Sequence, residues 1–164
     1  MSNNDGWMFL GIGSVTLFAI TLIISIIMGL SFDKNFNNNL VRASNAATVE
    51  TASIELNKAI KYLEVNDMTT GSTHVLYATP ASDLGYFYDN LKSSAIELEK
   101  VSGDKGTQLD KSNALLRFHE VVLTATGEID SPSYIDLYPS QKAITFFMIL
   151  AIIGLGITAI KIND

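Results

Sequence analysis

Residues 7–30 read WMFLGIGSVTLFAITLIISIIMGL, a run without a single Asp, Glu, Lys or Arg. A helix rises 1.5 Å per residue, so about 20 apolar residues cross the hydrocarbon layer of a bilayer. This run is therefore long enough to form a transmembrane helix. A cleaved signal peptide is the competing interpretation, but it favours a basic amino-terminal region, and residues 1–6 contain no Lys or Arg. We expect residues 7–30 to be retained as a membrane anchor.

Residues 143–160, AITFFMILAIIGLGITAI, form a second uncharged apolar run that is near the lower length limit for a transmembrane helix. Lys142 and Lys161 bracket it, and lysine side chains reach the headgroups from such positions. Tyr134 and Tyr138 precede it, where tyrosine rings favour the membrane interface. A buried helix of a soluble core is the alternative, but this run lacks the polar face that such a helix usually keeps. We predict two spans.

The chain has 164 residues, no cysteine and a formal net charge of −6. The absence of cysteine excludes disulfides and thiolate metal sites. The acidic balance argues against nucleic acid as a partner, because phosphates require clustered Lys and Arg. The predicted organisation is an amino-terminal tail (1–6), a first transmembrane helix (7–30), a helical-bundle domain (31–142), a second transmembrane helix (143–160) and a carboxy-terminal tail (161–164).

Small residues recur along one face of each span. They are Thr21, Ser25 and Gly29 in the first span, and Ala151, Gly154 and Thr158 in the second. Such stripes let helix backbones approach closely in lipid, where packing drives association. They predict contact between the two spans or with a partner's span, although small residues are common in spans without any such role.

The middle segment has helical rather than alternating periodicity. Its clearest apolar stripe consists of Val49, Ala52, Leu56, Ala59, Ile60 and Leu63, and a thinner one of Phe36, Leu40, Ala43 and Ala47 precedes it. We predict one helix that continues from the first span to about Val65. A kink is expected near Asn37, because the neighbouring asparagines compete for backbone hydrogen bonds.

Two further helices are predicted, at about 83–102 and 107–126, joined as an antiparallel hairpin. Asp83 or Ser82 caps the first, Gly103 suits the left-handed residue that ends it, and Thr107 with Asp110 resembles a capping box. The apolar residues expected on the last helix, which Gly127 ends, are Leu109, Leu115, Leu116, Phe118, Val122 and Leu123.

The chain must return to the membrane to form the second span, but after three antiparallel helices it would be at the end of the domain far from the membrane. One non-helical stretch, 69–81 or 128–141, must therefore run the length of the domain, and each can extend to about 45 Å. We favour 69–81, which is richer in β-branched and aromatic residues. The predicted fold class is all-α, with two transmembrane helices flanking a bundle of three helices plus one extended segment.

Two sequence features give opposite indications of the side of the membrane on which the domain lies. Lys34, Arg42 and Lys142 lie next to the spans on the domain side, which by the positive-inside rule favours a cytosolic domain. That rule applies to loops under about 60 residues, and longer domains translocate largely regardless of charge. The domain is also acidic, so we favour an extracytoplasmic location.

No catalytic or metal-binding pattern is recognisable. His74 lies near Ser72 without a nucleophile-elbow motif, and His119-Glu120 lacks the spacing of a zinc-protease helix. We expect no enzyme activity, no cofactor and no metal. Because three consecutive rings on a helix cannot all be buried, one of Tyr86, Phe87 and Tyr88 should be exposed, either as an interface anchor or to clamp the extended segment. The candidate partner or ligand contacts are Tyr77, Tyr86, Tyr88, Arg117 and a half-buried His119.

The order of span, long helix, antiparallel hairpin and span resembles the membrane-anchored four-helix-bundle sensor modules of bacterial chemoreceptors and related kinases. That family carries a HAMP linker and a signalling domain after the second span, where we expect only residues 161–164 here. Residues 55–94, ELNKAIKYLEVNDMTTGSTHVLYATPASDLGYFYDNLKSS, are similar to uncharacterised bacterial membrane proteins, with cyanobacteria as the suggested source. Neither resemblance assigns a role to a residue.

We therefore expect a non-enzymatic two-span membrane protein whose domain binds a partner protein or a second copy of itself, as an accessory, assembly or sensor-like subunit. One alternative is a bundle that senses a small solute between its helices. The other is a cytosolic scaffold tethered by a helical hairpin. The expected partners are the lipid bilayer and a membrane protein or a second copy, and not nucleic acid.

Overall fold

The chain is all-helical in the computed structural model, which describes residues 3–163. Residues 1–2 and 164 of the predicted tails lie outside the described residues. In chain order the elements are α1 (Asn3–Phe32), the π-helical turn η1 (Asp33–Asn37), α2 (Asn38–Ser44), α3 (Val49–Val65), η2 (Pro80–Ser82), α4 (Leu84–Val101), α5 (Gln108–Val122), η3 (Ile135–Leu137) and α6 (Gln141–Asn163).

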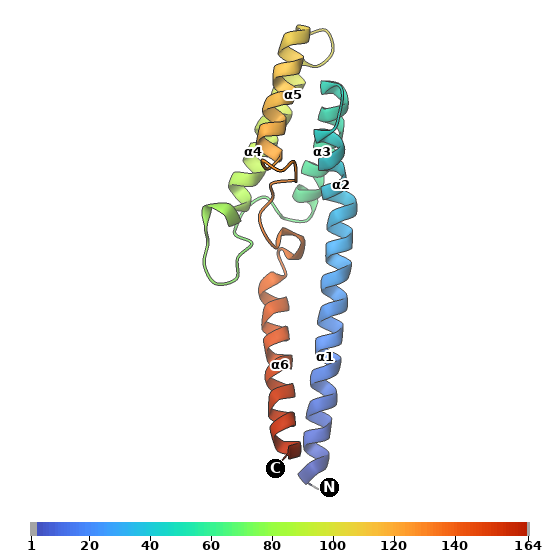
Figure 1. Cartoon of the computed structure of the whole chain (residues 1–164), viewed down its shortest axis with the longest axis vertical. Coiled ribbons are helices and arrows are strands. Elements are labelled where there is room, and N and C mark those ends of the chain that lie inside the picture. The colour runs from blue at the N-terminus through green and yellow to red at the C-terminus, as the bar shows by residue number, and fades with distance from the viewer. Residues whose placement is uncertain (1–2, 164) are drawn as a thin grey trace.

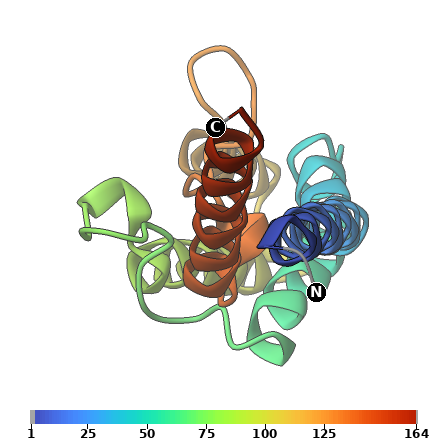
Figure 2. The ribbon, with the colours of Figure 1, turned by 90° about the horizontal axis from the view of Figure 1, so that it is seen from below.

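Two helices are long and apolar enough to cross a membrane. One runs from Gly6 to Ser44 over 39 residues, through η1 and α2, and the other from Gln141 to Lys161 over 21 residues. Helices α1 and α6 lie side by side with both chain ends at the same end of the molecule (Figures 1 and 2). In the most apolar stretch of each helix, only 11% of the first helix and 17% of the second is buried within the protein. A core helix of a soluble protein would instead be mostly covered by its own fold.

The first helix is far longer than a bilayer is thick. Its 39 residues correspond to about 58 Å at 1.5 Å per residue, against roughly 30 Å of hydrocarbon. Its outer part enters the core of the domain, where Phe32, Phe36 and Leu40 are at most 5% exposed. Near Asn37, where a kink was expected, the helix contains the π-helical turn η1, in which the amide of Asn38 bonds to the carbonyl of Asp33.

The helix does not continue to Val65, so this prediction is wrong. The chain leaves the helical conformation at Asn45, and Thr48 starts α3 as an N-cap whose side chain accepts a bond from the Thr51 amide. Ala47, expected on the apolar stripe, is exposed in this break. Because α3 packs back against α2 (Figure 1), the break reverses the direction of the chain.

The predicted extended segment at 69–81 is also wrong. The backbone bonds from Thr73 N to Ser82 O (3.0 Å) and from Leu84 N to Gly71 O (2.9 Å) bring the two ends of this segment together. It is therefore a closed loop and does not run along the domain. The α2–α3 reversal supplies the return that the extended segment was predicted to provide.

The hairpin of α4 and α5 was predicted correctly. Asp83 caps α4, Gly103 has a φ of +65°, and Thr107 and Asp110 form the capping box of α5. The apolar face of α5 differs from the prediction, because Leu109 and Leu116 are exposed. Its buried residues are Ala114, Phe118 and Val122.

Helix α5 ends earlier than predicted, at Val122 rather than Thr126. Gly127, with a φ of +80°, lies in the following tight turn, which Thr124 closes by donating its amide to the carbonyl of Glu128 (2.7 Å). The chain then passes through η3 to α6 along the side of α1 (Figure 1).

One apolar core joins the domain to the end of α1. Phe36 is its centre, fully buried, with its ring 4.7 Å from that of Phe32 and 6.0 Å from that of Phe87. Helices α2 to α5 each contribute to this core. Since Phe32 and Phe36 extend directly from α1, the domain and the first apolar helix share one packed body.

Candidate functional site

The contact between α1 and α6 is made by small residues. A Cβ built on Gly11 would lie 2.9 Å from Thr158 Cγ2, and one on Gly154 would overlap the Ser14 hydroxyl. These two close approaches place the backbone of each helix against a side chain of the other. Ala151, facing the same contact, is fully buried. We call this contact the α1–α6 seam.

The seam has a seven-residue repeat on both helices. Buried or half-buried positions that follow this repeat include Gly11, Ser14, Phe18, Thr21, Ser25, Met28 and Phe32 on α1, and Gln141, Ile144, Met148, Ala151, Leu155 and Thr158 on α6. Leu17 and Gly29 of α1 are also half-buried and lie outside the repeat. Alternating steps of three and four are typical of helices that cross at about 20°. The hydroxyls of Thr21 and Thr158 bond to carbonyls of their own helices, at 2.8 and 2.9 Å.

The structure brings most of the predicted small residues to this seam. Thr21, Ala151 and Thr158 are buried in it, and Ser25 is half-buried with its hydroxyl bonded to the Thr21 carbonyl. Gly29 lies elsewhere, at the edge of a cavity, where an added Cβ would come 3.4 Å from Asp136 Oδ2.

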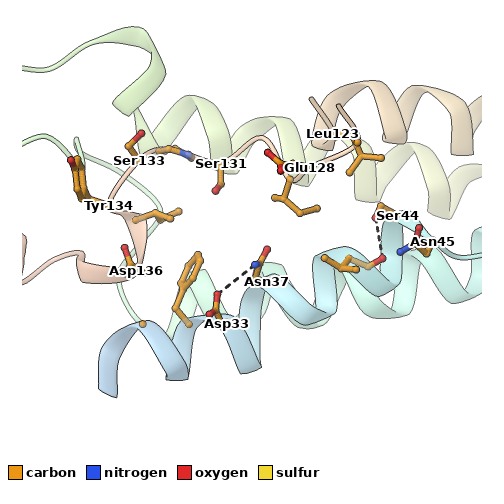
Figure 3. Close-up of a pocket in the computed structure, with 17 residues that line it drawn as sticks. Asp33, Asn37, Ser44, Asn45, Leu123, Glu128, Ser131, Ser133, Tyr134 and Asp136 are labelled. Carbon is orange, nitrogen blue, oxygen red and sulfur yellow. Dashed lines mark hydrogen bonds between the residues drawn. The ribbon is translucent and has the colours of Figure 1, made fainter. Parts of the chain in front are cut away.

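That cavity, of about 550 Å³, lies where α1 leaves its apolar segment. One wall is formed by η1 and α2, and the other by the chain from Leu123 to Asp136 (Figure 3). Asp33 and Asn37 bond to each other at 3.4 Å on the helical wall, facing Ser131, Ser133 and Asp136 on the other.

Its lining is acidic. Asp33, Glu128 and Asp136 contribute carboxylates, and no Lys or Arg is among the described residues that line it. The side chains of Asn37, Ser44, Asn45, Ser131 and Ser133 add neutral polar groups. We call it the acidic cavity. No group of three or more His, Asp or Glu side chains within the described part of the chain is placed to hold a metal ion.

The three consecutive rings on α4 divide as expected. Phe87 is buried, Tyr88 is half-buried, and Tyr86 is 67% exposed. Tyr86 stands between two hollows of about 640 and 290 Å³, and Pro80 and Asp83 line both of them. We call this region the Tyr86 surface.

Tyr88 belongs to a polar group between α3 and α4. Its hydroxyl donates to Glu64 Oε1 at 2.7 Å, and Lys92 Nζ lies 2.9 Å from the same oxygen. The bond from Lys92, with that from Tyr88, lowers the pKa of Glu64, and the bond to Glu64 raises the pKa of Tyr88. These side chains satisfy one another, so their contacts are explained by helix packing.

The predicted ligand group of Arg117, His119 and Tyr88 does not form. Arg117 is exposed and pairs with Glu97 at 2.6 Å, on the side of α5 that faces α4. His119 is half-buried as expected, and its Nε2 is buried without a hydrogen-bond partner among the described residues. None of the three lines the acidic cavity or either of the two hollows beside Tyr86. Tyr77 lies apart from them, in the loop before α4. The centre of its ring is 5.8 Å from that of the His74 ring.

An ion pair ties the far end of the domain together. Glu50, in the first turn of α3, accepts a bond from the Gly103 amide at 2.8 Å and lies 3.4 Å from Lys111 Nζ. The Gly103 bond, together with the amide of Glu50 itself and Lys111, lowers the Glu50 pKa to about 2. The sequence pattern did not reveal this contact, because it joins residues 53 positions apart.

Comparison with known proteins adds no relative. No protein-family model matches the chain, and neither the curated proteins nor the solved structures contain a significant match.

Proposed function

We propose that this chain is a non-enzymatic, two-span membrane protein that holds a helical-bundle domain at the extracytoplasmic surface to bind a partner protein or a second copy of itself. In this proposal α1 and α6 cross the bilayer, and the outer part of the first helix supports the domain. The role is that of an accessory, assembly or sensor-like subunit.

The observation that carries the proposal is the Tyr86 surface. A tyrosine that is 67% exposed and flanked by two hollows has the features of an interface anchor, because aromatic side chains concentrate binding energy where neighbouring pockets exclude water. Phe87 beside it is buried in the core, so the helix that presents Tyr86 is held in place. A rigid anchor loses little conformational entropy on binding.

The shared core of α1 and the domain supports a role at a membrane. Phe36 and Leu40 continue the first helix into that core, so a partner bound at Tyr86 would be held at a fixed distance from the bilayer. A movement of α1 against α6 would also displace the domain.

The partner proposal is tested with a photoreactive amino acid at position 86 of the full chain in native membranes. Lys105, exposed in the turn between α4 and α5, is the control position. We expect a discrete cross-linked product from position 86 and none from 105, with its mass distinguishing a second copy from another protein. Products of equal yield from both positions, or none from 86, would contradict the proposal.

The location of the domain is tested separately. Because the chain has no cysteine, Ser93→Cys and Ser2→Cys each provide a single site for a membrane-impermeant maleimide on intact cells. Labelling at 93 and not at 2 is expected. The reverse result would place the domain in the cytosol and favour the tethered scaffold.

A second candidate function, the sensing of a small cationic solute, rests on the acidic cavity. Its three carboxylates would attract a cation, and its position at η1 would allow binding to alter the junction of α1 with the domain, since π-helical turns are frequent at functional sites. This site would replace the predicted group around His119.

Thermal unfolding with a polyamine, and with a dicarboxylate as the opposite charge, tests the second candidate. A ligand of the folded state raises the melting temperature, so the polyamine alone should do so. The Asp33→Asn/Asp136→Asn variant should lose this shift. Asp130→Asn, an exposed carboxylate of the same loop outside the cavity, should retain it. Equal shifts in all three proteins would exclude the cavity as the site.

A further inference from the structure

The loop between α3 and α4 is fixed to the start of α6. The Tyr138 hydroxyl donates to the carbonyl of Thr70 at 2.9 Å, and Gln141 Nε2 donates to the carbonyl of Ser72 at 3.1 Å. A Cβ on Gly71, whose φ is +100°, would come 2.6 Å from the Tyr138 hydroxyl. These direct contacts therefore fix the position of the loop relative to the first turn of α6.

The tip of the loop is apolar and exposed. Leu76 is 90% exposed and Tyr77 is 68% exposed, the former being the most exposed large hydrophobic side chain in the described part of the chain. No Asp, Glu, Lys or Arg occurs from Met68 to Ser82. An uncharged segment of this kind leaves apolar area in water unless something covers it.

The tip lies where the apolar part of α6 begins. Leu76 and Tyr77 line a hollow of about 400 Å³ together with Tyr134, Gln141 and Thr145. Thr145 lies inside the second apolar run, one turn beyond the exposed Lys142. The loop hangs down to the level at which α6 starts (Figure 1).

We propose that Leu76 and Tyr77 insert into the interface of the lipid bilayer, as a third membrane contact of the domain beside α1 and α6. The inference rests on the proposed function, in which α6 crosses the bilayer. The occupant is lipid because the loop is held against the first turns of α6, where acyl chains and headgroups surround the helix. Tyrosine favours this depth, since its ring is apolar and its hydroxyl remains hydrated.

Two tyrosines strengthen this assignment. Tyr134, 64% exposed, lines the same hollow as Tyr77, and Tyr138 holds the base of the loop. The three rings gather at one end of α6, as expected of an aromatic belt at a membrane surface. A third contact beside α1 and α6 would restrain tilting of the domain towards the bilayer.

Single-cysteine variants of the full chain in liposomes test the inference. Leu76→Cys carries an environment-sensitive fluorophore, and the vesicles contain lipids with a nitroxide quencher either near the headgroup or deep in the acyl chain. Leu109→Cys is the matched control, because this exposed leucine lies in the first turn of α5, and α5 begins at the end of the domain far from α6 (Figure 1). Ile152→Cys in α6 is the reference for a site inside the bilayer.

We expect the nitroxide near the headgroup to quench the fluorophore at position 76 more strongly than the nitroxide deep in the acyl chain. The probe at 109 should be unaffected by either, and that at 152 should be quenched most by the deep one. No quenching at 76 while 152 is quenched would overturn the loop contact and leave the spans in place. No quenching at 152 would overturn both proposals.

Discussion

Gly154 of α6 lies directly against Ser14 of α1, so closely that a Cβ at position 154 would overlap the Ser14 hydroxyl. Two residues further on, Gly156 has open space around its backbone. The two glycines of one helix therefore have different roles, since one permits helix contact and the other is free of it. The same contrast holds on α1, between Gly11 and Gly13.

Replacing Gly154 by leucine should separate α1 from α6. The added side chain has no space in the seam, and such overpacking costs about 1–3 kcal/mol. Gly156→Leu is the matched control and should leave stability within about 0.5 kcal/mol. Unfolding of the detergent-solubilised protein in a denaturing surfactant, followed by circular dichroism, measures both. Equal effects of the two substitutions would show that the seam does not stabilise the fold.

Replacing Phe36 by alanine should destabilise the domain by about 3–5 kcal/mol, the usual cost of removing a buried ring. Phe36 is fully buried and stacks on Phe32, so the loss falls where α1 enters the core. Val41→Ala, at a 38% exposed position of α2, should cost under about 0.5 kcal/mol. Denaturant unfolding followed by circular dichroism provides the comparison. A small effect of Phe36→Ala would contradict a core shared by α1 and the domain.

Features set by neighbouring residues could be predicted from the sequence. Asp83, Gly103 and the Thr107–Asp110 box were recognised because caps act within one turn. The break at 45–48 was missed, since its two alanines favour helix and the reversal depends on packing of α3 against α2. Thr48 before the apolar Val49 was the one local signal of a new N-cap.

Features that join distant segments could not be predicted. The acidic cavity combines the end of α1 with residues 123–136, which only the fold brings together. On α5, one apolar stripe contains Leu109 and Leu116 and another Ala114 and Phe118, and the second is buried. Its alanine permits close approach of the neighbouring helices, whereas periodicity alone could not choose between the stripes.

Removing the cap of α4 should weaken the domain. Asp83 accepts a bond from the Tyr86 amide at 3.1 Å, and Asp83→Ala should cost about 1 kcal/mol, because that amide loses its acceptor. Asp83→Asn keeps an acceptor and should retain most of the stability. Asp89→Ala, at an exposed position within the same helix, controls for the loss of a carboxylate. If Asp83→Ala and Asp89→Ala unfold at the same denaturant concentration, the cap contributes nothing.

Glu50 should make the stability of the domain depend on acidic pH. The Gly103 amide, the Glu50 amide and Lys111 lower its pKa from 4.5 to about 2. A carboxyl with a lowered pKa stabilises the fold above its unfolded pKa, and this contribution is lost as pH falls towards the folded value. The melting temperature of the native chain should therefore exceed that of Glu50→Gln at neutral pH, and the difference should shrink between about pH 5 and pH 2. Glu99→Gln, at an exposed position on α4, should show no such convergence. A difference between native and Glu50→Gln proteins that stays constant over this range would exclude the charged contact with Gly103 as its source.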